Sequence, residues 1–228
     1  PPRPCRPCCE RPHLMPAAIR LDVFSDPVCP WCYVGKANLD RALESRPDHP
    51  FQIEWHPFQL NPEIPQEGVP KRDYLEAKFG GAAKVDAIHD RLREVARAAG
   101  LPLNPDVPKR QPNTLDAHRV IHWAGAEGRQ NAVVAALFRA YWVEGRDIGN
   151  TGVLADIAAA AGMDRAAVLR LLDSDADAED VAARDADARA KGVSAVPTFL
   201  IARQYLASGA QSPELWGQVI DDLTKARP

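Results

Sequence analysis

The sequence predicts an α/β fold in which a strand-helix-strand unit is separated from a final strand hairpin and helix by a block of helices. Apolar and polar residues alternate in the stretches IRLDVFSD and FQIEWHPF, as they do in half-buried strands. From Asn61 to about Lys191 apolar residues recur instead at helical spacing, apart from the proline-rich segments 62–70 and 102–112. After Gly192 two short β-type runs, PTFLIA and QYLAS, precede a last helical run.

Within the helical block, one apolar stripe predicts a helix that Gly100 and Pro102 end. Further helices fit residues 114–126 and 131–144. The stripe consists of Val85, Ile88, Leu92, Val95 and Ala99.

Short polar residues mark the starts of two later helices. Asn150 or Thr151 can cap GVLADIAAAAG, and Asp164 can cap RAAVLRLLDS, because such side chains accept hydrogen bonds from free backbone N–H groups. A helix rich in Ala, Asp and Arg then runs to a stop at Gly192, and Pro213 suits the first turn of the last helix.

Composition excludes several classes of function. The chain has 228 residues, of which 46% are hydrophobic and 26% charged, as in an ordinary globular protein. A net charge of -3 does not indicate the excess of positive charge that binding to nucleic acid or to an anionic membrane surface requires. The sequence contains no run of about 18 uncharged apolar residues, which is the length that a transmembrane helix needs.

Residues 1–16 are rich in Pro, Arg and Cys without helical or strand periodicity, and we expect them to form a disordered leader. Translation from Met15 would make the first fourteen residues non-native. The leader lacks the apolar region of a secretory signal, so we expect a cytoplasmic protein. Thiols are kept reduced there, which favours a catalytic or metal-binding role for a close cysteine pair.

The stretch SDPVCPWCYVGK places Cys29 and Cys32 where the first strand gives way to a helix. Free backbone N–H groups and the helix dipole favour a thiolate at a helix start, so Cys29 is the predicted nucleophile. Cys32 lies nearly one helical turn further on, where its sulfur can reach that of Cys29 and resolve a mixed disulfide. Pro30 and Trp31 between them are expected to tune the redox potential.

Zinc is the main alternative use of this pair. Cys5 and Cys8 have the same spacing, and twenty residues separate the two pairs, close to a four-cysteine ribbon. A ribbon places its cysteines on short turns, whereas a full strand and helix fit here, so we predict no metal site. A third reading, two buried structural thiols, fits poorly because proline and tryptophan at a helix start pack badly in a core. Cys9 is a further cysteine of the leader.

Two other polar residues are weaker candidates for the site. Asp26 precedes the nucleophile by three residues and could move a proton through water, although an Asp before a proline commonly makes a turn. His56 ends the second predicted strand and could face the site, although a histidine without a catalytic role is also common there.

These motifs resemble those of the DsbA-like thioredoxin-fold oxidoreductases. Within that family the chain looks most like the FrnE-type branch, through SDPVCPWCYVGK, PFQLNP and SAVPTFLIARQYLASGAQ, and the likeness spans residues 19–225. The resemblance implies a thioredoxin-like α/β domain made of residues 17–62 and 190–228. An all-helical insertion, residues 63–189, would separate the βαβ half from the ββα half.

The resemblance also assigns roles near the cysteines. It implies that Pro197 follows a cis peptide bond opposite the pair, and that Val196 offers backbone groups to an extended substrate segment. From the residues alone, AVPTF is simply a strand that begins with proline. Thioredoxins and periplasmic DsbA carry a buried acid six residues before the nucleophile, whereas this chain has Val23. A proton-shuttling role at that position is therefore in doubt.

The predicted function is a thiol-disulfide oxidoreductase that acts on protein or low-molecular-weight disulfides and thiols and has no bound cofactor. The alternative is a glutathione-dependent isomerase, because the fold also resembles 2-hydroxychromene-2-carboxylate isomerases, which usually carry serine in place of Cys29. Asn61 lies where those isomerases bind ligand, and glutathione is a candidate co-substrate. The sequence does not determine the oligomeric state, and it is compatible with a homodimer.

Overall fold

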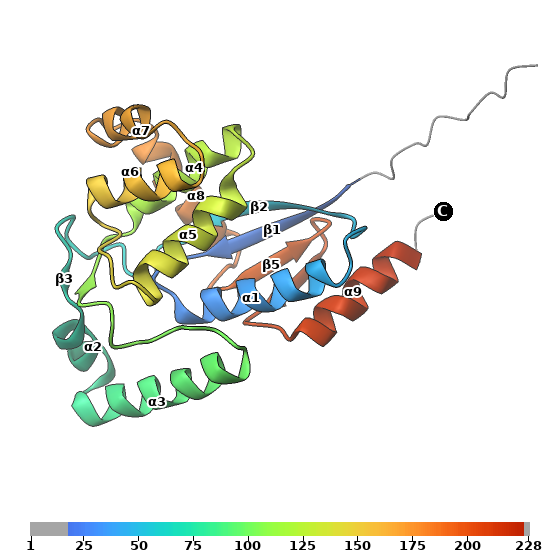
Figure 1. The fold of residues 1–228 in the computed structure, drawn as a ribbon, viewed down its shortest axis with the longest axis horizontal. Coiled ribbons are helices and arrows are strands. Elements are labelled where there is room, and N and C mark those ends of the chain that lie inside the picture. Colours follow the sequence, from blue (N-terminus) through green and yellow to red (C-terminus); the bar gives the residue numbers. More distant parts are fainter. Residues whose placement is uncertain (1–17, 226–228) are drawn as a thin grey trace, which may run out of the picture.

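The computed structural model describes residues 18–225, and its centre is a four-stranded sheet in the order β2-β1-β5-β6 (Figure 1). The strands are β1 (Ile19–Ser25), β2 (Phe51–Pro57), β5 (Thr198–Ile201) and β6 (Tyr205–Ser208). β1 runs parallel to β2 and antiparallel to β5, so Leu21 stands between Ile53 on one side and Ile201 on the other. A parallel pair followed by an antiparallel hairpin is the sheet of a thioredoxin-like fold.

Two helices pack side by side along the sheet, α1 (Pro30–Glu44) and α9 (Pro213–Lys225) (Figure 1). Their apolar sides meet the strands in a continuous core. Trp216 of α9 contacts Phe199 of β5 edge to face, with ring centroids 4.8 Å apart. This contact holds α9 against the sheet, and α1, which carries the cysteines, packs beside α9.

The insertion supplies the remaining helices, which gather at one end of the sheet except for the separate pair α2 and α3 (Figure 1). Helices α4, α5 and α8 contact β2. The bounds are α2 (Lys71–Phe79), α3 (Ala82–Ala98), α4 (Leu115–Ala126), α5 (Gln130–Trp142), α6 (Thr151–Ala160), α7 (Arg165–Leu172) and α8 (Ala178–Ala190). None of the helices within residues 18–225 has the length and apolar character needed to cross a bilayer.

The predicted caps are confirmed. Asn150 Oδ1 accepts a hydrogen bond of 3.1 Å from the Val153 N–H at the start of α6. Asp164 Oδ1 accepts one of 3.0 Å from the Ala167 N–H at the start of α7. Local sequence therefore sets where these helices begin.

The insertion contains a small feature that periodicity did not predict. Strands β3 (Val69–Pro70) and β4 (Arg110–Gln111) form a two-residue antiparallel ladder between the two proline-rich segments. The Lys71 N–H also donates to the Lys109 carbonyl over 2.9 Å. The insertion is thus helical except at this ladder, which fixes the start of α2. The predicted division into residues 17–62, 63–189 and 190–228 stays a prediction.

Candidate active site

The two cysteines lie at the start of α1, as the sequence predicted. Cys29 is the N-cap residue, its N–H donates to the Asp26 carbonyl over 2.9 Å, and the helix begins at Pro30. Proline suits this first position because its missing N–H would have no helical partner. Cys29 and Cys32 are both free thiols and approach each other to 3.3 Å. A small movement of either side chain brings the sulfurs to bonding distance.

The segment before β5 forms the opposite wall. The Val196–Pro197 peptide bond is cis, as the resemblance implied. The Cys29 thiol donates to the Val196 carbonyl, with 3.6 Å between Sγ and O. Gly35 of α1 permits this approach, because a Cβ there would lie only 3.0 Å from Cγ of Pro197. The structure therefore brings together residues 167 positions apart in sequence.

Cys32 lies deeper than Cys29 and is fully enclosed. Burial is the main reason why its pKa is raised well above the ordinary value, and the neighbouring Cys29 side chain raises it further. The Ser25 hydroxyl and the backbone N–H of Asp26 face the Cys32 sulfur and lower the pKa in part. At neutral pH Cys32 is a protonated thiol.

A groove of about 360 Å³ opens beside Cys29. The start of α1, the segment before Pro197, α2 and α3 form its walls. Trp31 between the cysteines is 41% exposed, and three more exposed apolar side chains surround the opening. These are Leu60, Phe79 and Ile88. The surface around the cysteines is thus apolar enough to bind an apolar part of a substrate.

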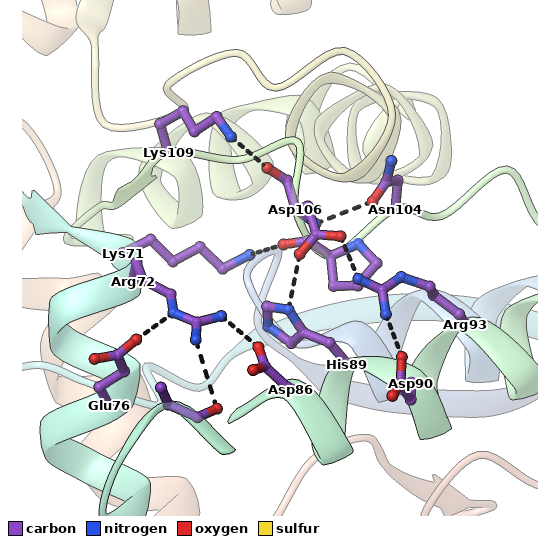
Figure 2. Close-up of polar contacts among 12 residues, drawn as sticks. Lys71, Arg72, Glu76, Asp86, His89, Asp90, Arg93, Asn104, Asp106 and Lys109 are labelled. Atoms are coloured by element: carbon purple, nitrogen blue, oxygen red, sulfur yellow. Dashed lines mark hydrogen bonds and ion pairs between the residues drawn. The ribbon is translucent and has the colours of Figure 1, made fainter. Parts of the chain in front are cut away.

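One cation is buried in the wall of this groove. Lys71 is 4% exposed, and its ammonium lies 4.4 Å from the centroid of the Trp142 ring and donates to the Pro105 carbonyl over 3.1 Å. Burial lowers the pKa of Lys71 to about 7. Figure 2 shows Lys71 pointing toward the loop that carries Asp106. Sequence reasoning missed Lys71, since a lysine after a proline gives no local sign of burial.

The loop that receives Lys71 is held by ion pairs (Figure 2). Asp106 accepts from His89 Nδ1 over 3.0 Å and also pairs with Arg93, and both partners belong to α3. The Asp106 carbonyl accepts from Lys109 over 2.8 Å. The loop is therefore tied to α3, and the surroundings of Lys71 are fixed from two sides.

Asn61 lines the groove, as its candidacy required. Its Oδ1 accepts from the Tyr74 hydroxyl over 2.6 Å and from the Lys78 ammonium. Both donors belong to α2, so Asn61 fastens that helix to the segment that follows β2.

His56 does not line the groove. Its position agrees better with a strand-end histidine that has no catalytic role. Its Nε2 lies 2.7 Å from Asp22 Oδ1, and its ring stacks on Phe24 at 5.0 Å. The strand register pairs β1 and β2 here and turns the imidazole into this cluster. Asp22, Glu54 and His56 lie close enough to suggest a cation site. Two guanidinium groups already occupy the cluster as an ion-pair network, those of Arg20 and Arg184.

Asp26 is completely buried. Its Oδ2 accepts from the Leu60 N–H over 2.7 Å and its Oδ1 from the Val28 N–H over 3.3 Å. The second bond is the turn that the sequence suggested. Burial nevertheless outweighs these bonds and raises the pKa of Asp26 to about 7.

Cys5 and Cys8, the other half of the zinc alternative, lie outside the described residues, as does Cys9. The other two thiols face each other beneath the groove rather than on an exposed turn. That arrangement agrees better with a redox pair than with half of a zinc ribbon.

Comparison with known proteins identifies the family. A family model described as the DSBA-like thioredoxin domain matches residues 20–221. The chain is 31% identical to a probable DsbA oxidoreductase, SCO1869 of Streptomyces coelicolor, with a TM-score of 0.82 over 92% of each chain. It is also 26% identical to YwbO of Bacillus subtilis, over 92% of this chain and 99% of that protein.

Two more distant structures share the fold. A 2-hydroxychromene-2-carboxylate isomerase has a TM-score of 0.68 at 20% identity, over 90% of this chain and 96% of that one. The cytosolic disulfide reductase DsbM of Pseudomonas aeruginosa, solved with GSH, has a TM-score of 0.64 at 21% identity, over 90% and 99%. The chain belongs to the DsbA-like thioredoxin-domain family and is an enzyme of its oxidoreductase or isomerase type.

Proposed function

We propose that this protein is a thiol-disulfide oxidoreductase of the FrnE-type branch, with Cys29 as the nucleophile and Cys32 as the resolving cysteine. The observation that carries the proposal is the position of Cys29. Its sulfur lies between that of Cys32 and the carbonyl of Val196, at the base of an open apolar groove. A substrate sulfur that enters the groove meets Cys29 first.

The proposed reduction proceeds in two exchanges. The Cys29 thiolate attacks one sulfur of the substrate disulfide, forms a mixed disulfide and releases the other sulfur as a thiolate. Cys32 then loses its proton and attacks the Cys29 sulfur, which releases the second substrate thiolate and leaves the Cys29–Cys32 disulfide. Both released thiolates take up protons, so two electrons pass from the enzyme to the substrate. Oxidation of a dithiol is the same sequence in reverse.

Four neighbouring residues shape this chemistry in the proposal. Val196 presents backbone groups to an extended substrate segment beside Pro197, which is a form of strand addition. Pro30 and Trp31 set how strongly the reduced pair is stabilised, because they determine the local surroundings of both sulfurs. The exposed Trp31 ring also provides apolar contact for the substrate.

Glutathione is our proposed low-molecular-weight partner. The groove has room for a short peptide-like thiol, and the buried cation of Lys71 is suited to a carboxylate. DsbM, which shares the fold, has been solved with GSH. DsbM is described as cytosolic, which supports our expectation that this protein also works in the cytoplasm.

The test of the proposed function is a redox titration in glutathione buffers, followed by alkylation of free thiols and mass mapping. We expect Cys29 and Cys32 to pass together from two alkylated thiols to one disulfide within the range of potentials that glutathione buffers reach. A pair that stays reduced throughout would rule out the oxidoreductase reading. Isomerase turnover on a chromene carboxylate without thiol exchange would support the alternative enzyme class instead.

Replacing Lys71 with methionine is expected to weaken the use of glutathione. A hydrogen-bonded pair between Lys71 and a carboxylate contributes roughly 1.5–3 kcal/mol, so KM for glutathione disulfide should rise about tenfold or more. Steady-state kinetics with glutathione disulfide measure this.

The matched control is Lys225→Met, which removes a lysine charge from an exposed position at the end of α9, outside the groove. It should leave KM unchanged. If both variants behave like the wild type, Lys71 does not hold the small thiol.

A further inference from the structure

The enclosed position of Cys32 creates a chemical requirement for the proposed exchange. Only a thiolate attacks a disulfide, yet burial keeps Cys32 protonated at neutral pH. A nearby group must therefore accept its proton. The buried acid that thioredoxins carry in the first strand is absent, since Val23 occupies that position and is buried in the apolar core.

Asp26 is the buried acid whose backbone contacts Cys32. The backbone N–H of Asp26 faces the Cys32 sulfur, so the two residues meet in the turn between β1 and α1. The carboxyl has no exposed surface, and it accepts hydrogen bonds from two backbone N–H groups and the Thr114 hydroxyl. These bonds hold the carboxyl in one place next to the turn that leads into α1.

Groups from three helices face this carboxyl. His118 of α4 brings Nε2 to 3.9 Å from Asp26 Oδ1. Asp185 of α8 adds a negative charge that raises the pKa of Asp26, and Arg189 partly offsets that charge through a 3.0 Å hydrogen bond to Asp185. Tyr141 of α5 is a buried neutral phenol whose pKa is raised by burial and by Asp26.

His118 is held in a neutral form that can accept a hydrogen bond. Burial lowers its pKa to about 3, and its ring is hydrogen-bonded to the backbone of Phe58. Nε2 is buried and has no hydrogen-bond partner among the described residues. This nitrogen lies 3.9 Å from Asp26 Oδ1, beyond hydrogen-bond distance, and a neutral imidazole adds no positive charge that would favour the ionised carboxyl. His118 therefore leaves the raised pKa of Asp26 uncompensated.

We propose that Asp26 accepts the proton of Cys32 during resolution of the mixed disulfide, an inference that rests on the oxidoreductase function proposed above. The Cys32 proton moves to the Asp26 carboxylate, and the Cys32 sulfur forms a bond to Cys29 Sγ while the bond from Cys29 to the substrate breaks. The departing substrate thiolate takes a proton from solvent. When the enzyme is reduced again, Asp26 returns its proton to Cys32.

The pKa of about 7 suits this role, because the group is a strong enough base and yet largely ionised just above neutral pH. No other carboxylate is both buried and in contact with the turn that carries the cysteines, among residues 18–225. In this chain a buried acid thus stands in the turn, three residues after the strand position held by Val23.

The test uses dithiobis(nitrobenzoate), a disulfide that releases one coloured thiol in each exchange. In the wild type the first release reports attack by Cys29 and the second reports resolution by Cys32. Asp26→Asn should slow the second release roughly 100-fold near neutral pH, the usual contribution of a positioned base. The first release should change little. The second release should also lose its inflection near pH 7 and keep rising with pH until Cys32 ionises by itself.

Asp22→Asn is the matched control, since it neutralises another buried carboxylate that lies away from the cysteines. It should leave the second release unchanged. A parallel measurement on the wild type keeps the test valid if Asp26→Asn folds poorly. The infrared band of a protonated carboxyl should disappear over the same pH range in which the second release accelerates, and this band should be absent from Asp26→Asn.

The outcomes separate the two proposals. Equal second-release profiles in wild type and Asp26→Asn would overturn the role of Asp26 while leaving the dithiol chemistry intact. A uniform slowing of both releases at every pH would also overturn it, because that pattern indicates a purely structural residue. A wild type that shows no second release and forms no Cys29–Cys32 disulfide would overturn the proposed function itself.

Discussion

Cys29→Ser is expected to reduce disulfide exchange to the uncatalysed rate, because a serine hydroxyl does not attack disulfides at neutral pH. Cys32→Ser should still perform the first exchange, since Cys29 faces the groove and Cys32 lies behind it. This variant should then stall as a stable mixed disulfide. Insulin reduction measures the loss of turnover, and intact-protein mass spectrometry detects the trapped substrate on Cys29.

The two variants check each other. Both keep the size of the side chain nearly constant, so neither should change the packing of α1 against the sheet. Substantial turnover by Cys29→Ser, or a substrate adduct on Cys32 in that variant, would contradict the assigned order of attack. Turnover that survives in Cys32→Ser would show that an external thiol resolves the intermediate.

The second large effect concerns stability, and it also arises at Asp26. Burial raises the pKa of Asp26 from 3.8 in the unfolded chain to about 7 in the fold. Between these values the folded protein binds more protons than the unfolded chain, so this group makes the fold less stable as pH rises from about 4 to 7. At about 1.4 kcal/mol for each pKa unit, the full cost above pH 7 is on the order of 4 kcal/mol.

Asp26→Asn removes this cost because an amide has no charge to bury. The variant should be more stable than the wild type at about pH 8, by up to roughly 4 kcal/mol, and the gain should shrink toward pH 4. The true gain is smaller, since the amide offers one oxygen to the two backbone N–H groups of Leu60 and Val28. Urea unfolding at about pH 5 and about pH 8 measures the difference.

The stability of the wild type must be compared with that of Asp26→Asn, because His118 also changes how stability depends on pH. Its pKa is lowered from 6.5 to about 3, so the unfolded chain binds the proton first and the fold loses stability as pH falls below 6.5. Below pH 6.5 the effects of Asp26 and His118 have opposite signs and partly cancel in the wild type. The difference between wild type and Asp26→Asn isolates the carboxyl. A difference that does not depend on pH would mean that Asp26 ionises normally in the fold.

Local sequence predicted those parts of the molecule that local rules determine. The strand around Leu21 and the caps at Asn150 and Asp164 depend on neighbours within a few residues, and each is confirmed. The cysteine pair was found because its two members are a helical turn apart. The cis bond before Pro197 came from the resemblance, since the sequence around it reads equally well as an ordinary strand.

The surroundings of these residues could not be predicted in the same way. Asp26 resembles a turn residue in sequence, and its burial depends on Leu60, which follows β2, and on His118, which belongs to the insertion. Lys71 is buried because the loop at Pro105 and the ring of Trp142 enclose it. Contacts between residues so far apart in the chain leave no periodic pattern in the sequence. The pKa shifts of Asp26 and Lys71 therefore follow only from the folded structure.

The groove is assembled from two parts of the chain with different tasks. The cysteine pair and Val196 come from the start of α1 and the segment before β5, whereas the wall opposite them comes from α2 and α3. Changes in α2 and α3 can therefore alter which molecules reach the sulfurs without altering how the sulfurs exchange electrons. A lineage of such enzymes can diversify its substrates by mutating one wall while its redox machinery is inherited intact.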